Sequence, residues 1–141
     1  MIFTIISPDK NTPYHSSNAA SLVILFQANN RSVLFTGDID ETRIDNLSTL
    51  SIGDVDVIEL PHHGQWSEES QIFIDTKQPG AIIQSTSRTR HSTDEWTIPD
   101  QTIRFVTAID GTITTTITPG GELSIFGSND PATMTPCVLT N

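Results

Sequence analysis

The sequence predicts a mixed α/β domain in which helices cover one face of a mixed β-sheet. Short apolar runs rich in β-branched residues recur along the 141-residue chain, and glycine, proline or asparagine pairs separate them. Two of the intervening stretches begin with helix-start signals instead. The predicted order begins with strands, continues with two helices that each precede a strand and ends in a hairpin, and the length suits one domain with a sizeable core.

The beginning of the chain predicts one strand and then a hairpin. Residues 2–6 are a short apolar run that ends at a Ser-Pro-Asp turn. Residues 21–27 are almost continuously apolar, as in a strand that is covered on both faces. Asn29 and Asn30 form a tight turn into residues 32–35, so we expect these two strands to pair.

Two helices are predicted on either side of a strand at residues 55–60. Asp40 is a suitable N-cap for the first helix, which would place three apolar residues on one side, namely Ile44, Leu47 and Leu50. Ser67 begins the second helix, which we expect to bury Ile72 and Phe73. The later strands are expected at 81–84, 103–106, 112–118 and 123–126, after a polar irregular stretch at 85–98 and with a loose tail at 128–141.

Composition excludes several classes of protein. Seven basic against seventeen acidic residues give a net charge of −10, which argues against broad electrostatic attraction to nucleic acid or anionic membranes. Nucleic acid held through a metal ion stays compatible with this charge. No apolar stretch reaches the roughly 18 residues of a membrane span, and no signal segment opens the chain. We therefore expect a soluble protein, cytoplasmic by default, and the single Cys137 excludes an internal disulfide.

The residues that suggest chemistry follow two of the predicted strands. Asp38 comes after Leu34-Phe35-Thr36-Gly37, and His62 and His63 come after Leu60-Pro61 and before a glycine. If the two strands are neighbours in the sheet, the carboxylate and the imidazoles converge on one edge, where a divalent metal can bind. The simpler interpretation is that Asp38 caps the following helix and that both histidines are exposed loop residues.

The order and spacing of these motifs resemble the second half of a metallo-β-lactamase-fold hydrolase, most closely the soluble domain of ComEC-type DNA-uptake proteins. The resemblance covers about residues 2 to 118 and implies a half-domain at 1–127 that belongs to an αββα sandwich. The His-x-His-x-Asp-His motif of the first half of that fold is not in this sequence. Gln65, where the family usually has serine, indicates a diverged member.

The resemblance also implies roles for single residues. Related enzymes carry a metal ligand immediately before the glycine, which makes His63 the expected ligand and His62 a supporting residue or substrate contact. Asp38 would bridge two metals, zinc being the first candidate and manganese the second. ComEC-type domains place an asparagine three residues before the serine of the matching strand, as Asn18 does here, and we expect it near the site.

A second group of candidates lies in the stretch 85–98. ComEC-type domains have Gly-His-Pro there, and this chain has Arg90-His91-Ser92, so only the imidazole of His91 matches as a third metal ligand. Arg88 and Arg90 are two of the seven basic residues, and guanidinium groups beside a metal suit a phosphate oxygen. Solvated loop residues are the alternative for all three.

Half a metal site leaves three interpretations open. The chain can be the C-terminal half of a metal-dependent hydrolase, with a nucleic-acid phosphodiester as the leading substrate, completed by an N-terminal half-domain. It can instead be a non-catalytic relic that serves as a binding or dimerisation module, as a homodimer for example. The third interpretation is an unrelated β-rich domain. In the first case we expect little turnover from the isolated chain, because two or three ligands hold a metal weakly.

Overall fold

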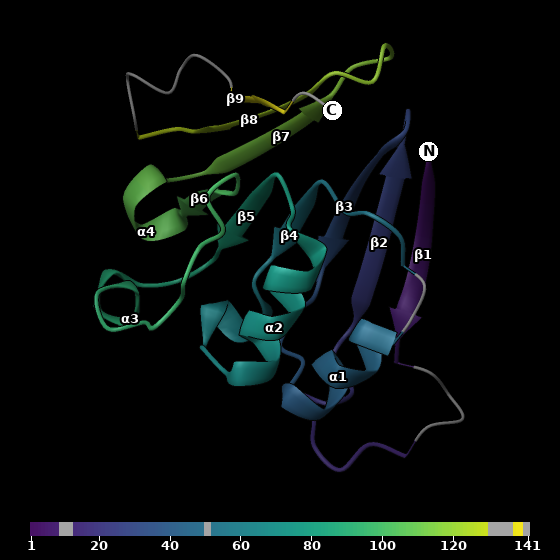
Figure 1. Cartoon of the computed structure of the whole chain (residues 1–141), viewed down its shortest axis with the longest axis vertical. Coiled ribbons are helices and arrows are strands. Elements are labelled where there is room, and N and C mark those ends of the chain that lie inside the picture. The colour runs from purple at the N-terminus through teal and green to yellow at the C-terminus, as the bar shows by residue number, and fades with distance from the viewer. Residues whose placement is uncertain (9–12, 50–51, 130–136, 140–141) are drawn as a thin grey trace.

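A computed structural model describes residues 1–8, 13–49, 52–129 and 137–139, and it contains two β-sheets (Figure 1). The larger sheet has six strands in sequential order, and it confirms the predicted mixed α/β class. The strands are β1 (Ile2–Ser7), β2 (Val23–Ala28), β3 (Arg31–Phe35), β4 (Val57–Glu59), β5 (Ala81–Gln84) and β6 (Ile103–Val106).

Strand direction changes once across this sheet. β1, β2 and β3 are antiparallel neighbours, whereas β3, β4, β5 and β6 run parallel to one another. The predicted hairpin between β2 and β3 is confirmed, and Asn29 and Asn30 both have positive φ, at 50° and 62°. Because four parallel strands end at the same edge of the sheet, the residues that follow each of them lie close together.

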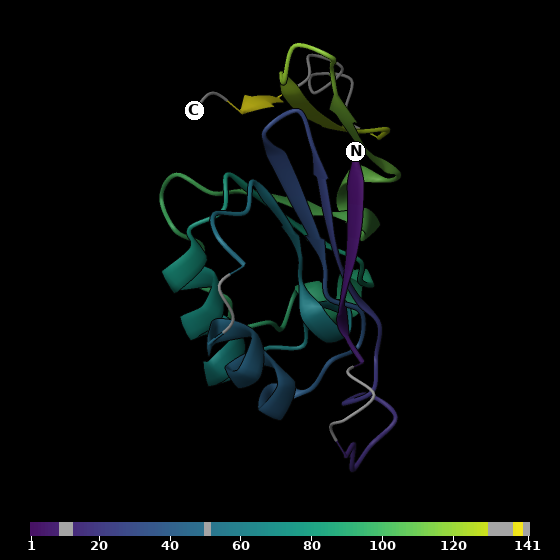
Figure 2. The same ribbon diagram turned by 90° about the vertical axis from the view of Figure 1, so that its right-hand side faces the viewer.

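α1 (Glu41–Thr49) follows β3 and packs beside α2 on one face of the large sheet (Figure 2). The carboxylate of Asp40 accepts a hydrogen bond from the backbone of Arg43, as expected of an N-cap. Two of the three predicted apolar residues are buried against the sheet, Ile44 and Leu47. Leu50 lies outside the described residues.

α2 (Glu68–Lys77) begins at the predicted N-cap, since the hydroxyl of Ser67 accepts a hydrogen bond from the backbone N–H of Ser70. Phe73 is buried as expected, but the prediction for Ile72 is wrong, because that side chain is 53% exposed. Ile74 is buried in its place. An α-helix turns about 100° per residue, so the residues before and after Phe73 point in different directions. Only one of them, here Ile74, can share the buried face of Phe73.

The C-terminal strands form a second sheet instead of extending the first. β7 (Ile113–Ile117), β8 (Leu123–Gly127) and β9 (Cys137–Leu139) pair antiparallel, and they lie on the face opposite the two helices (Figure 2). The expected loose tail is therefore wrong for Cys137–Leu139. The buried Arg31 connects the sheets: it donates to the carbonyls of Gly121 and Leu139 and pairs with Asp56 at 2.8 Å.

The second sheet covers only part of the face on which it packs. It buries Val33, Val57 and Phe105, near the middle and far side of the large sheet. Toward β1, by contrast, Phe3 and Ile5 stay 62% and 67% exposed. The run at 21–27 is therefore fully covered on its helix side only, where Val23 and Leu25 lie. We refer to the exposed residues Phe3, Ile5 and Phe35 and the half-buried Ile24, which share this side by strand register, as the open apolar face.

Three short helical segments complete the fold. A 3-10 turn, η1 (Pro61–Gly64), follows β4, and α4 (Thr107–Asp110) follows β6. α3 (Arg88–His91) lies within the stretch that the sequence predicts to be irregular. Within the described parts of the chain, no helix has the length and apolar character that crossing a membrane requires.

Candidate functional site

The first motif turn follows β3 directly. Gly37 has a φ of +59°, and a Cβ atom there would approach the carbonyl oxygen of Leu22 to 3.0 Å, so glycine suits both the conformation and the space. The carbonyl of Gly37 accepts a hydrogen bond of 2.9 Å from the backbone N–H of His62. The Gly37-Asp38 turn and the histidine turn are thus joined through the backbone.

The second motif turn, η1, holds two non-glycine residues in the left-handed region. His62 and His63 have φ values of 49° and 58°, which L-residues adopt at a cost of roughly 1–2 kcal/mol each. Two buried side chains hold the turn through hydrogen bonds to the carbonyl oxygen of Gly64. The Nε1 atom of Trp96 donates to it at 2.9 Å, and the Nε2 atom of Gln84 donates to it at 3.4 Å. Strained backbone held by buried partners is typical of functional turns.

Asp38 and His63 converge, as the sequence predicts. Nε2 of His63 lies 3.6 Å from Oδ1 of Asp38, and both side chains are about half exposed. The other ring nitrogen, Nδ1, lies 3.0 Å from the carbonyl oxygen of Ser85. A carbonyl can only accept, so Nδ1 carries a proton, and Nε2 either presents a lone pair in the neutral ring or donates toward the carboxylate in the protonated ring. Metal-binding histidines are oriented by this kind of hydrogen bond.

Glu59 is a neighbour of this pair that the sequence reasoning missed. Burial raises the pKa of its carboxyl group, and the charge of Asp38 adds to the effect, while the backbone hydrogen bond from Gly37 and the charge of His63 lower it. Its backbone is tied to the preceding strand, because the hydroxyl of Thr36 donates to the Glu59 carbonyl at 2.7 Å. The available signal was an acidic residue at the end of the strand, three positions before His62.

His91 does not join the pair as a third ligand. Its Nδ1 atom lies 3.3 Å from Oδ2 of Asp94, a carboxylate that also accepts from Arg104 and Gln84. Burial alone would raise the pKa of Asp94, but the hydrogen bonds from Arg104 and Gln84 and the charges of Arg104 and His91 lower it. Among the described residues there is no group of three or more histidine, cysteine, aspartate or glutamate side chains that could hold a metal.

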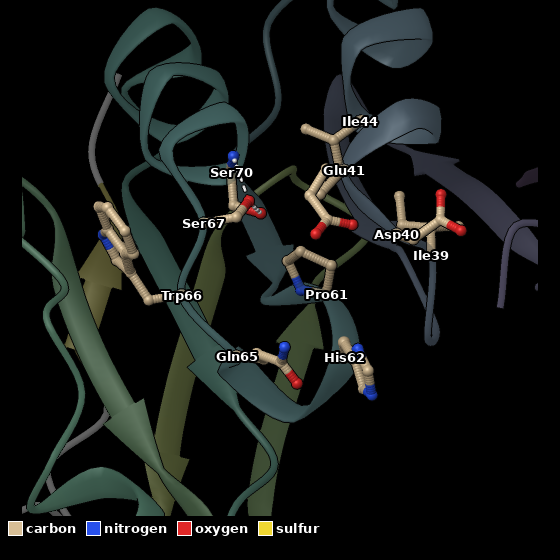
Figure 3. A pocket seen from close by; sticks show the side chains of 10 residues that line it. All are labelled: Ile39, Asp40, Glu41, Ile44, Pro61, His62, Gln65, Trp66, Ser67 and Ser70. Atoms are coloured by element: carbon tan, nitrogen blue, oxygen red, sulfur yellow. Dashed lines mark hydrogen bonds between the residues drawn. The ribbon is translucent and has the colours of Figure 1, made fainter.

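His62 borders a different feature from His63. It lines a small pocket between η1 and the first turn of α1, with Gln65 on its own side and Glu41 and Ile44 on the other (Figure 3). The space there is about 20 Å³, roughly that of one water molecule. His62 thus borders this pocket, whereas His63 faces Asp38.

The remaining predicted residues lie in three different places. Arg90 is close to the histidine turn, because its Nη1 atom donates to the carbonyl of His62 at 3.2 Å. Arg88 is exposed on the same short helix. Asn18 is half-buried in the turn before β2, where its carbonyl accepts from the N–H of Ser21, and no described contact links its side chain to Asp38.

Comparison with known proteins adds one relative. No family model matches the sequence. The chain is 29% identical over 115 residues to "Recombination protein 2" of Haemophilus influenzae (strain ATCC 51907 / DSM 11121 / KW20 / Rd). The match covers 78% of this chain and 14% of that protein, so the chain spans a small part of the relative's length.

Proposed function

We propose that the chain carries one half of a metal-dependent hydrolase site of the metallo-β-lactamase type, with Asp38 and His63 as ligands of a divalent cation. The observation that carries the proposal is the orientation of His63, whose Nε2 atom faces Asp38 while its Nδ1 atom is held by the Ser85 carbonyl. Their separation of 3.6 Å allows both atoms to bind one ion at about 2.0–2.2 Å. Zinc is the first candidate for such a nitrogen and oxygen pair, and manganese is the second.

Two ligands are fewer than the three that catalytic zinc sites use. A second polypeptide therefore supplies the others in this proposal, either an N-terminal half-domain or a second copy of the chain. The open apolar face supports this part, because Phe3 and Ile5 expose most of their surface next to each other on one side of the sheet. Contiguous apolar patches of this kind usually mark an interface.

The site's residues have distinct tasks in this function. A bound zinc ion lowers the pKa of a water molecule toward neutrality and so supplies a nucleophile. The Ser85 carbonyl keeps the His63 ring in one tautomer and orientation. Trp96 and Gln84 hold the strained turn in place through Gly64. A nucleic-acid phosphodiester is the substrate in this proposal, and a relative named as a recombination protein is compatible with it. Because the chain has a net charge of −10, such a substrate must be held by short-range contacts.

The alternative is a non-catalytic binding or dimerisation module, and the same open apolar face favours it. A relic domain would keep the face that associates and lose the metal. The two functions differ in one measurable property, which is metal binding by Asp38 and His63.

The proposal can be tested by calorimetric zinc titration of the wild-type chain and of the Asp38→Asn variant. We expect wild-type binding that Asp38→Asn weakens at least about tenfold, and little cleavage of single-stranded DNA by the isolated chain. Equal zinc binding by both proteins would contradict the metal site. Efficient cleavage that Asp38→Asn abolishes would show that no second polypeptide is needed.

A further inference from the structure

A hollow of about 460 Å³ lies beside His63 at the edge of the sheet where the parallel strands end. Its size is within the range of small-ligand pockets. Ser85 and Thr86 directly follow β5, and Thr107 follows β6, so the hollow lies where open parallel sheets bind ligands. The lining residues are His63, Ser85, Thr86, Ser87, Arg90 and Thr107.

The charge of this hollow differs from that of the rest of the chain. Seventeen acidic residues are present in the sequence, yet none lines it, and its one permanently charged group is the guanidinium of Arg90. Several other pockets on the described residues have carboxylates in their lining, for example Asp40 and Glu41 beside His62 and Asp54 near the β2–β3 turn. An apolar pocket between the two sheets, by contrast, has neither an acidic nor a basic side chain in its lining. In an acidic protein, a carboxylate-free hollow with a cation selects an anion at short range.

Arg90 is held so that most of its donors stay free. Its Nη1 atom donates to the carbonyl of His62 at 3.2 Å, which orients the planar group against the histidine turn. No other described contact uses its remaining side-chain N–H groups, which can therefore bind two oxygens of one ligand.

Thr86 supplies a second donor. Its Oγ1 atom is buried away from solvent and has no hydrogen-bond partner within the described part of the chain, so a rotation about χ1 is needed to turn this hydroxyl into the hollow. Buried hydroxyls are paired in most proteins, so an unpaired one requires an explanation. The position of Thr86 is fixed, because its backbone N–H donates to the hydroxyl of Thr107 at 3.0 Å.

Ser87 supplies a third donor. Its hydroxyl oxygen accepts a hydrogen bond of 3.3 Å from the backbone N–H of Arg90, which leaves the hydroxyl proton free to donate outward. The three donors come from a guanidinium and two hydroxyls at separate positions of the lining. Such a set suits a tetrahedral oxyanion better than the planar carboxylate, which offers only two oxygens.

The geometry points to a phosphoryl-binding subsite in this hollow, formed by Arg90, Thr86 and Ser87. It deepens the proposed function and rests on it for the reaction at the adjacent Asp38–His63 pair. Binding of the phosphoryl group itself needs no metal. The same group can come from a substrate phosphodiester or from free phosphate.

Binding can be measured in metal-free buffer by NMR titration with two probes, inorganic phosphate and a thymidine dinucleotide. We expect a Kd of about 1 mM or tighter for at least one probe, with shifts at the amides of residues 85–90. A tighter dinucleotide assigns the subsite to a substrate phosphodiester, and tighter phosphate assigns it to the free anion. Failure of both probes to bind would overturn the inference.

Matched variants separate the subsite from general charge effects. Arg90→Gln should weaken binding at least about tenfold, whereas Arg88→Gln removes the same charge from the same short helix, outside the lining, and should change it less than about twofold. Equal losses would show that only net charge matters and would overturn the inference.

Thr86→Val distinguishes a role of this hydroxyl in binding from a role in stabilising the fold. It removes an unpaired buried hydroxyl without changing the side-chain shape, so the melting temperature should stay the same or rise while phosphate binding falls about tenfold. Unchanged binding would remove Thr86 from the subsite and contradict the inference. Asp38→Asn should weaken zinc binding at least about tenfold and leave phosphate binding intact, so a failed metal site and a failed subsite give different results.

Discussion

The Nε2 atom of His63 lies 3.6 Å from the Oδ1 atom of Asp38, although the two residues follow different strands. One backbone contact between these two turns and one with a third turn create this proximity. The Gly37 carbonyl binds the N–H of His62, and the Ser85 carbonyl binds the ring of His63. The pair therefore depends on the parallel arrangement of β3, β4 and β5, which brings these turns to one edge.

His63→Asn should weaken zinc binding at least about tenfold, and His62→Asn should change it less than about twofold. Only His63 faces Asp38, whereas His62 borders the pocket under α1. Asparagine tolerates the left-handed backbone that both positions require, so the two variants carry the same conformational change. Calorimetric titration measures the effect, and a larger loss at His62 would reverse the assignment of the ligand.

Gly64→Ala should destabilise the protein by roughly 1–3 kcal/mol more than Gly53→Ala. Both glycines have a positive φ, at 73° and 74°, so the backbone strain is matched. A Cβ atom at Gly64 would approach the buried side chain of Gln84 to 2.4 Å, but at Gly53 nothing lies within 4 Å. Urea unfolding of both variants measures the difference, and equal losses would show that Gln84 can move away.

Asp94→Asn should lower the free energy of unfolding by about 1.5–3 kcal/mol at pH 7. The hydrogen bonds and charge of Arg104 outweigh burial and lower the pKa of Asp94 in the folded protein. Its stabilisation is therefore complete above the unfolded pKa of about 3.9 and is lost as the pH falls through the lower folded value. Urea unfolding at pH 7 and near pH 3 should show a difference that shrinks in acid. A constant difference would indicate that the carboxylate charge plays no part.

Glu59→Gln should have the opposite effect on stability: it should raise the free energy of unfolding at pH 7 in metal-free buffer. Burial raises the folded pKa of Glu59, so its ionised form is disfavoured in the folded state. The cost is absent below the unfolded pKa of about 4.3 and grows as the pH rises through the higher folded value. The pH dependence of unfolding in the wild type and the variant measures it. Destabilisation at pH 7 would mean that its contacts with Gly37 and Thr36 outweigh the cost of burial.

The wild-type chain should associate at micromolar concentration, and Phe3→Thr combined with Ile5→Thr should make it monomeric. These two side chains are the most exposed members of the open apolar face, and threonine keeps the preference for a strand. Ile72→Thr is the matched control, because Ile72 is 53% exposed on the outer side of α2. Sedimentation velocity measures the mass of each protein, and a monomeric wild type would contradict association through this face.

Local signals in the sequence were sufficient for most elements. Asn29 and Asn30 predict a tight hairpin turn because asparagine tolerates positive φ, and both residues have it. Ser67 predicts the start of α2 because its hydroxyl can bind a free backbone N–H, as it does at Ser70. The convergence of Asp38 and His63 was also predictable, since glycine turns after two adjacent apolar strands place both residues at one edge.

Only the tertiary structure decided which long-range partners each residue has. His91 matches a ligand position in sequence, yet Asp94 and Arg104 draw it into a separate charged network. The C-terminal hairpin has the same alternating pattern as a strand of the large sheet, but it forms a second sheet on the opposite face. A period-two pattern specifies that one side of a strand is buried, and it carries no information about which surface buries it. Packing between segments far apart in the sequence determines that surface.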